Sequence, residues 1–232
     1  MLLNRYYAQS FLEMKKAFEI VFNDEYVIVL NKIAKILVQP SPKKEKYTLT
    51  TLLEEQISQS VYPCHRLDRQ TTGLIAYAKT SQIQREIMEQ FRKGQVKKEY
   101  IAFVKGKVKS KTHILEDYIR DREAKRFGER AKSAKTFCRA LKVFNDFSVV
   151  ELRPLTGRTN QLRIQLAKRG HPILGERKYA FGRDFKVKFR RLALHAYFLS
   201  FIHPVSGERL RLEIDLPEDM KAFLQAHWGV KY

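Results

Sequence analysis

The chain is poor in cysteine, in acidic residues and in long apolar runs. Only two cysteines occur among 232 residues, Cys64 and Cys138, so no disulfide framework is indicated and a reducing compartment is expected. Charged residues interrupt every apolar run, which argues against a membrane span, and residues 1–16 lack the apolar core of a signal peptide. These absences predict a soluble, cytoplasmic protein.

Metal and nucleotide-loop signatures are also missing. Neither a GxGxxG nor a Walker A sequence occurs, and the six histidines lack Cys pairs and HxxxH spacing. The sequence therefore gives little support for metal chemistry or for a phosphate-binding glycine loop. Cys64 and His65 are adjacent, so their side chains point apart in extended chain, which disfavours a catalytic thiol pair.

The scarcity of acid leaves a large positive charge. Lys and Arg number 45 against 25 Asp and Glu, a net charge of +20, which favours a nucleic-acid partner first and an anionic membrane second. Residues 105–135 hold eleven basic and five acidic side chains with few large apolar ones, and we expect them to be exposed and mobile. Residues 158–191 hold eleven basic and two acidic side chains with interleaved Phe and Tyr, most of which we assign to the core.

Hydrophobic periodicity predicts alternating strands and helices. The expected strands are residues 26–32, 98–104, 137–143, 147–152, 193–201 and 209–214. The expected helices run from Thr50 to Pro63, from Thr80 or Ser81 to Gly94, from a Thr159 cap to Gly170, and onward from Pro217. Such a mixture predicts an α+β fold, with a mainly antiparallel mixed β-sheet flanked by helices and loops. We expect an extension at 1–19, with a possible helical turn around 9–18, and a single domain over 20–232.

The most informative stretch is His65 to Leu74, where Asp68 stands between two arginines just before Thr-Thr-Gly. Thr and Gly supply turn chemistry, and the apolar run that follows predicts a strand. Judged by this stretch alone, Asp68 is best explained as a salt-bridged or turn-capping residue. Only other segments of the chain can give it a further role.

Several segments carry motifs in a shared order. HRLDRQTTGL at residues 65–74 resembles the HRLDxxTSGL signature of the RluA family of pseudouridine synthases, and residues 25–40 resemble that family's first motif. Lys98-Glu99-Tyr100 resembles its Lys-x-Tyr element, and residues 153–163 resemble its third motif. Further matches lie at residues 170–175, 194–196, 203–204 and 216–217. The resemblance covers nearly all of the chain from residue 20, and it implies the pseudouridine-synthase fold.

The chain departs from the family pattern at a few positions. Ile33 and Lys35 replace the usual Pro and Gly, and Thr72 replaces Ser. Asn160 and Gln165 stand where histidines are usual, and Glu176 replaces an Asp. Residues 1–19 are too short for the S4 RNA-binding module of many relatives, so the resemblance implies a form without an S4 domain.

The resemblance implies a reaction that needs neither cofactor nor metal: isomerisation of uridine to pseudouridine in rRNA or tRNA. It implies that Asp68 is the catalytic carboxylate, that Arg163 pairs with it and that Tyr100 stacks on the uracil. Arg66 would fill the space left by a flipped-out uridine, and Leu162 would pack under the base. Arg158, Thr159 and Gln161, at a predicted helix N-terminus, suit an RNA phosphate.

Two other functions stay open. A non-catalytic RNA-binding or ribosome-assembly protein would explain the charge but not the set of Asp68, Tyr100 and Arg163. A nucleoside or glycoside hydrolase usually employs paired carboxylates, and no second acid recurs near the motifs. The sequence leaves open which uridine is modified, and whether Asp68 attacks the ribose, adds to the ring or abstracts a proton. We expect a monomer.

Overall fold

The computed structural model describes residues 17–41, 45–109, 112–120, 130–180 and 185–227. Contacts divide the chain into two compact units: unit 1 contains residues 1–96 and 198–214, and unit 2 contains residues 97–197 and 215–232. Both are α+β, and every strand pairing whose register is defined is antiparallel, as predicted. A single domain over residues 20–232 stays a prediction.

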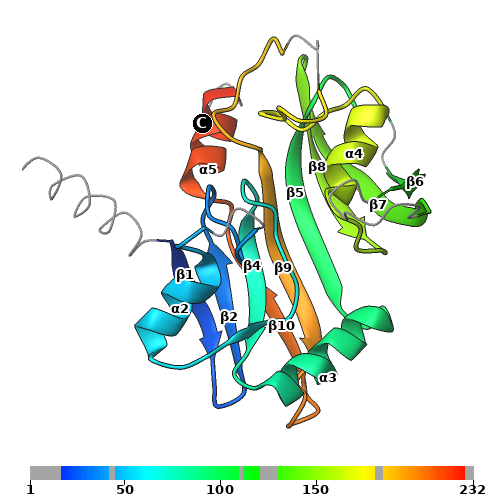
Figure 1. Ribbon diagram of the computed structural model, residues 1–232. Coiled ribbons are helices and arrows are strands. Elements are labelled where there is room, and N and C mark those ends of the chain that lie inside the picture. The colour runs from blue at the N-terminus through cyan, green and yellow to red at the C-terminus, as the bar shows by residue number, and fades with distance from the viewer. Residues whose placement is uncertain (1–16, 42–44, 110–111, 121–129, 181–184, 228–232) are drawn as a thin grey trace, which may run out of the picture. The chain divides into compact units, whose positions relative to one another are not determined.

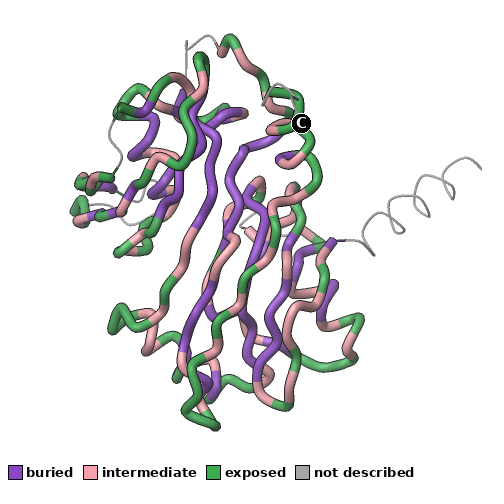
Figure 2. Tube along the Cα trace, turned by 180° about the vertical axis from the view of Figure 1, so that it is seen from behind, coloured by how far each residue is buried: buried purple, intermediate pink, exposed green. Residues whose placement is uncertain are grey.

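Unit 1 is built on an antiparallel sheet, whose strands Figure 1 shows, and its buried core is mainly aliphatic. Its strands are β1 Phe18–Asn23, β2 Val27–Lys32, β3 Tyr62–Pro63, β4 Thr72–Ala78, β10 Arg209–Glu213 and the second half of β9 Leu194–Ile202. They follow the order β1-β2-β4-β9-β10, and β3 also pairs with β4. Every residue of β4 is buried, and Figure 2 shows burial concentrated along the strands.

Unit 1 also contains two helices, α2 Leu49–Ile57 between β2 and β3, and α3 Ser81–Arg92 after β4. Thr80 caps α3 by accepting from the amide of Ile83 at 3.2 Å, which confirms one of the two predicted caps. On this helix Ile83 and Ile87 are buried, whereas Met88 is 49% exposed. The prediction that α2 continues to Pro63 is wrong: the chain turns left-handed at Ser58, with φ of 52°.

Unit 2 contains β5 Lys97–Lys105, β6 Thr112–Ile119, β7 Lys132–Val143, β8 Phe147–Pro154, and the first half of β9, in the order β9-β5-β8-β7-β6. Its helices are α4 Gln161–Lys168 and α5 Glu218–His227. The segment 105–135 was predicted to be exposed and mobile. Four of the eight residues of β6 are exposed, as predicted, but β6 is a regular strand that pairs along its whole length with β7. Residues 110–111 and 121–129 of that segment lie outside the described residues.

An aromatic cluster forms part of the core of unit 2. Phe103 of β5 stacks on Phe223 of α5 with ring centroids 5.5 Å apart, and Phe147 and Phe189 pack edge-on against Phe223. Phe189 comes from the basic segment 158–191, so this aromatic is a core residue, as expected. Phe181 lies outside the described residues.

The N-terminal prediction needs one correction. Phe18 does not end a helical turn but begins β1, where it pairs with Lys32 of β2. Residues 9–16 of the expected turn lie outside the described residues. Over the described parts of the chain, no helix combines the length and the apolarity needed to cross a membrane.

Candidate active site

Asp68 lies in the loop of unit 1 that joins β3 to β4, and its backbone is closed into a turn. The amide of Thr71 donates a hydrogen bond to the carbonyl of Asp68 at 3.0 Å. Thr71 and all of β4 are buried, whereas Asp68 is half-buried. The carboxylate is therefore carried by a turn that is anchored to a buried strand.

Lys32, at the end of β2, ties this turn to the sheet. Its side chain is fully buried, and its ammonium group donates to the carbonyls of Thr71 at 2.8 Å and Ile33 at 2.9 Å. The same nitrogen lies 3.4 Å from the carbonyls of Asp68 and Arg69. A buried ammonium is costly unless it is hydrogen-bonded, so this network couples burial of Lys32 to one conformation of the turn. The Asn31-Lys32 pair was the sequence signal for it, but only as part of a motif.

Lys35 explains how the chain tolerates one departure from the family pattern. Its φ of 72° is left-handed, a conformation that glycine adopts without strain and that costs other residues about 1–3 kcal/mol. Two hydrogen bonds hold it there: its amide donates to the carbonyl of Arg69 at 2.7 Å, and Nε of Arg69 donates to its carbonyl at 3.0 Å. The backbone shape that the usual glycine would allow is thus retained.

His65 and Cys64 have structural roles in the same loop. Nε2 of His65 accepts a hydrogen bond from the amide of Ala76 at 3.0 Å, which requires the tautomer with its proton on Nδ1. Burial raises the pKa of the Cys64 thiol to about 12, so this cysteine stays protonated and unreactive. Arg66, between them and Asp68, is exposed.

Tyr100 lies on β5 of unit 2 and is 7% exposed. Lys98 precedes it by two residues, so both side chains leave the same face of the strand. Burial lowers the pKa of the Lys98 ammonium to about 8. The face of β5 that carries Tyr100 therefore also carries a lysine with a lowered pKa, a group that our site prediction did not include.

The third motif forms a loop that leads into α4. Asn160, with φ of 53°, is the residue before the helix, so the prediction of a Thr159 cap is wrong. The buried amide of Gln161 closes the loop: its oxygen accepts from the amide of Arg158 at 3.0 Å and from the hydroxyl of Thr156 at 2.8 Å. Gln161 thus supports the loop, and its predicted contact with RNA stays a prediction.

A second buried glutamine, Gln165, fixes α4 to the β6–β7 hairpin. Its amide nitrogen donates to the carbonyls of Leu115 and Ala134, both at 3.0 Å, and its oxygen accepts from the hydroxyl of Thr136 at 2.6 Å. The hydroxyl of Thr136 in turn accepts from Gln161 at 2.9 Å. The family usually has a histidine at this position. In this chain Gln165 occupies it, and both the nitrogen and the oxygen of its amide are hydrogen-bonded.

Arg163 is held by two further residues that depart from the family pattern, Glu176 and Asn160. Its Nε and Nη2 donate to Glu176 at 2.7 and 2.9 Å, and its Nη1 donates to the side-chain oxygen of Asn160 at 2.7 Å. The guanidinium also lies 5.2 Å from the ring centroid of Tyr179. With 14% of its side chain exposed, Arg163 is not the helix-surface arginine that the local sequence favours.

The carboxylate of Glu176 is fixed from several sides and its side chain is 0% exposed. Burial by itself would raise the pKa of Glu176, but Arg163 and the amides of Lys178 and Tyr179 lower it overall. Gly175, the residue before Glu176, has φ of 80°. A Cβ at Gly175 would lie 1.8 Å from the carbonyl oxygen of Arg191, so the backbone passes close to Arg191 there. We refer to Arg163, Glu176 and Asn160 as the arginine clamp.

The remaining predicted residues of the third motif differ in exposure. Leu162 is buried, Thr159 is half-buried and Arg158 is exposed. Nε of Arg158 donates to the carbonyl of Ser133 at 3.0 Å, so its guanidinium is oriented by β7. Arg66 and Asp68 thus share one loop of unit 1, and all other predicted site residues belong to unit 2. In the described residues, no cluster of three or more His, Cys, Asp or Glu could hold a metal ion.

Comparison with known sequences gives one consistent result. The family described as RNA pseudouridylate synthase matches residues 26–168. The tRNA pseudouridine synthase C of Vibrio cholerae is 36% identical over 231 residues, covering 89% of this chain and 94% of that protein. The ribosomal large subunit pseudouridine synthase D of Xylella fastidiosa is 34% identical over 227 residues, covering 90% of this chain and 69% of that protein.

Comparison with solved structures agrees at the level of the fold. The structure of human RNA pseudouridylate synthase domain containing 4 superposes with a TM-score of 0.72 at 24% identity, covering 89% of this chain and 91% of that one. The related human domain containing 1 gives a TM-score of 0.68 at 22% identity, covering 92% and 95%.

Proposed function

Because the chain belongs to the RluA family of RNA pseudouridylate synthases, which isomerise uridine to pseudouridine in RNA, we propose that Asp68 carries this reaction on a uridine turned out of a folded tRNA or rRNA. The enzyme is an isomerase. The observation that carries the proposal for Asp68 is its place in the HRLD loop, on a turn that a buried lysine holds to the sheet.

The reaction breaks the bond from C1′ of the ribose to N1, turns the uracil and joins C5 to C1′. C5 releases its proton and N1 takes one up, so the composition is unchanged. A carboxylate suits the first step, as a nucleophile toward the ribose or the ring or as a base. Asp68 must be ionised for any of these roles. The turn that Lys32 anchors supports this proposal because it fixes the backbone from which the carboxylate projects.

We propose that Arg163 pairs with Asp68 and keeps its charged form favoured. The arginine clamp supports this role: a guanidinium that is held by Glu176 and Asn160 loses little entropy when it meets a further carboxylate. Tyr100 supplies a ring to stack on the uracil and a hydroxyl to move a proton. Leu162, which is buried on α4, packs under the base.

Extruding a uridine from folded RNA costs about a few kcal/mol of lost stacking. Arg66 is exposed beside Asp68, and we propose that it takes the place of the extruded base. Arg158 and Thr159 contact RNA phosphates, together with Gln161 or the loop that it supports. The excess of basic over acidic residues favours this partner.

The names of the relatives point to two substrate classes, since one is a tRNA enzyme and the other acts on the large ribosomal subunit. We propose that this protein modifies tRNA or rRNA as a monomer in the cytoplasm. A second function, an RNA-binding or ribosome-assembly protein that keeps the fold, would share the charge but would not release the C5 proton.

The test is release of tritium from tRNA and rRNA labelled at C5 of uridine. The wild type is expected to release tritium, and Asp68→Asn is expected to abolish release with an unchanged melting temperature. Asp215→Asn is the matched control, because that side chain is 90% exposed and belongs to no predicted site. An active Asp68→Asn enzyme would contradict the mechanism, and an inactive wild type that binds RNA would favour the second function.

A further inference from the structure

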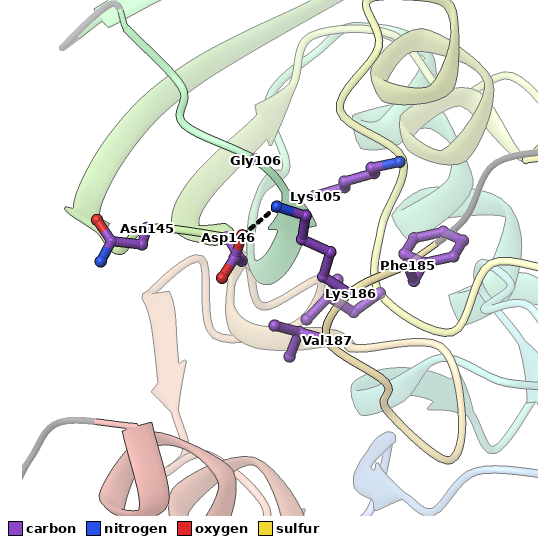
Figure 3. A pocket seen from close by; sticks show the side chains of 8 residues that line it. Lys105, Gly106, Asn145, Asp146, Phe185, Lys186 and Val187 are labelled. Carbon is purple, nitrogen blue, oxygen red and sulfur yellow. Dashed lines mark ion pairs between the residues drawn. The ribbon is translucent and has the colours of Figure 1, made fainter.

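Unit 2 contains a cavity of about 350 Å³ that none of the predicted site residues lines. It lies where the end of β5 meets the turn between β7 and β8 and the segment after residue 184. Figure 3 shows Asn145 and Asp146 on one side and Phe185 on the other, with the Lys186 side chain between them. The volume is within the range of cavities that hold small ligands.

The lining combines cations, an amide and an aromatic ring. The ammonium of Lys105 lies 5.7 Å from the centroid of the Phe185 ring, and that of Lys186 lies 3.6 Å from the carboxylate of Asp146. The second pair is exposed, at 82% for the lysine and 42% for the aspartate, so solvent screens it and Lys186 can exchange Asp146 for another anion. These groups match the parts of a nucleotide: a phosphate, a polar base edge and a flat ring.

The backbone around the cavity is already ordered by hydrogen bonds. The amide of Lys105 donates to the carbonyl of Pro172 at 2.9 Å, and the amide of Gly106 donates to the carbonyl of Asp146 at 2.8 Å. The hydroxyl of Ser148 donates to the carbonyl of Gly106 at 2.8 Å. A ligand that enters therefore does not have to order the backbone at the end of β5 or in the turn between β7 and β8, which lowers the cost of binding.

The chain beside the cavity continues the basic character. From residue 185 to 190 exposure alternates: Phe185, Val187 and Phe189 are half-buried, and the basic residues between and after them are exposed. Lys188 and Arg190 are thus exposed, but unlike Lys186 they do not line the cavity. A simple anion would need neither the ring nor the amide, and a metal ion would find only one carboxylate in the lining.

We propose that this cavity binds a nucleotide of the substrate RNA other than the uridine that reacts, with its base against Phe185 and its phosphate on Lys105 and Lys186. The proposal rests on the proposed function, because it takes RNA as the substrate. The cavity would anchor the RNA at a second point and so contribute to the choice of target.

Binding of the tritiated tRNA and rRNA is measured by filter binding over a series of salt concentrations, with the full-length chain and matched pairs of variants. Phe185→Leu removes the ring and keeps an apolar side chain, whereas Phe185→Tyr keeps the ring. Lys186→Ala removes a cation from the lining, whereas Lys188→Ala removes an exposed cation outside it. Phe185→Leu and Lys186→Ala are each expected to weaken binding roughly tenfold relative to the matched partner.

Equal affinities within either pair would overturn the proposal. Equal affinities of Lys186→Ala and Lys188→Ala would mean that RNA responds only to the total charge. Equal affinities of Phe185→Leu and Phe185→Tyr would mean that the ring does not stack on RNA. Melting temperatures check folding, and if Phe185→Leu fails to fold, the lysine pair decides. Tritium release by the wild type separates this proposal from the proposed function. An inactive wild type with unequal pairs rejects only the function, and an active one with equal pairs rejects only the cavity.

Discussion

Glutamine in place of Glu176 removes one charge from the arginine clamp and keeps the size of the side chain. The Glu176 side chain is 0% exposed and that of Arg163 is 14% exposed, so Arg163 would lose its charged partner in a place that water barely reaches. Removing one partner of a buried ion pair costs about 3–5 kcal/mol. We expect the lower end, about 3 kcal/mol, because Asn160 still accepts from Arg163.

A loss of that size lowers the melting temperature by about 6–12 °C in a chain of this length. Glu89→Gln is the matched control, since Glu89 also accepts from an arginine, Arg92, at 2.6 Å, but both side chains are exposed. Solvent screens such a pair, so the control should melt almost as the wild type does. An equal fall in both variants would contradict a special role for the clamp.

Catalysis and pH provide two readouts that general destabilisation would not reproduce. At a temperature where both proteins are folded, Glu176→Gln should lower kcat of tritium release roughly tenfold or more, and Glu176→Asp, which keeps the charge, should restore part of it. The pKa of Glu176 is lowered in the fold, so its stabilisation is present above about pH 4.5 and is lost as pH falls through the lowered value. The stability gap between wild type and Glu176→Gln should therefore narrow below about pH 4.5.

Three further substitutions test buried polar side chains, those of Lys32, Thr136 and His195. Lys32→Met leaves loop carbonyls without their buried donor, at about 1–3 kcal/mol for each, and should lower both the melting temperature and tritium release. Thr136→Val removes the hydroxyl that joins the two buried glutamines of α4, and should destabilise the protein while Thr112→Val, at an exposed position, does not. Burial and Arg191 lower the pKa of His195 to about 4. The stability of the wild type should therefore fall as the pH is lowered from about 6.5 to 4, and it should fall less steeply in His195→Gln.

Each of these outcomes can fail in a defined way. Normal activity of Lys32→Met would mean that the turn holds Asp68 without the ammonium. Equal melting temperatures for the two threonine variants would mean that the glutamines find other partners. For His195, the unfolded chain takes up a proton that the buried imidazole refuses, so an unchanged slope in the variant would assign the acid sensitivity to other groups.

Segments with strong local periodicity were predicted well. The apolar run of β2 and the apolar face of α3 are both visible in residues one to four positions apart. The local sequence therefore predicts these two elements. Strand β6 was missed because its apolar residues do not alternate with polar ones: Ile114 and Leu115 are neighbours, as are Tyr118 and Ile119, inside a basic stretch. What makes it a strand is pairing with β7, a partner that local composition does not reveal.

The site shows the same division. The motif pattern identified Asp68, Tyr100 and Arg163 as candidates, and it marked Asn160 and Glu176 as departures. It did not reveal that both departures contact Arg163, since Glu176 lies 13 residues further along the chain. It also did not predict the burial of Lys32 or the shared hydroxyl of Thr136.

The sequence by itself determined the chemistry that is available: a basic chain, an aspartate among arginines in the HRLD stretch, and the order of motifs that places the chain in its family. Only the tertiary structure decided which charges are buried and with which partners. The physical reason is that the energy of a charge depends on its exposure and on distances of a few ångströms. Those quantities arise when segments far apart in the chain pack together, as the turn of Asp68 does on Lys32.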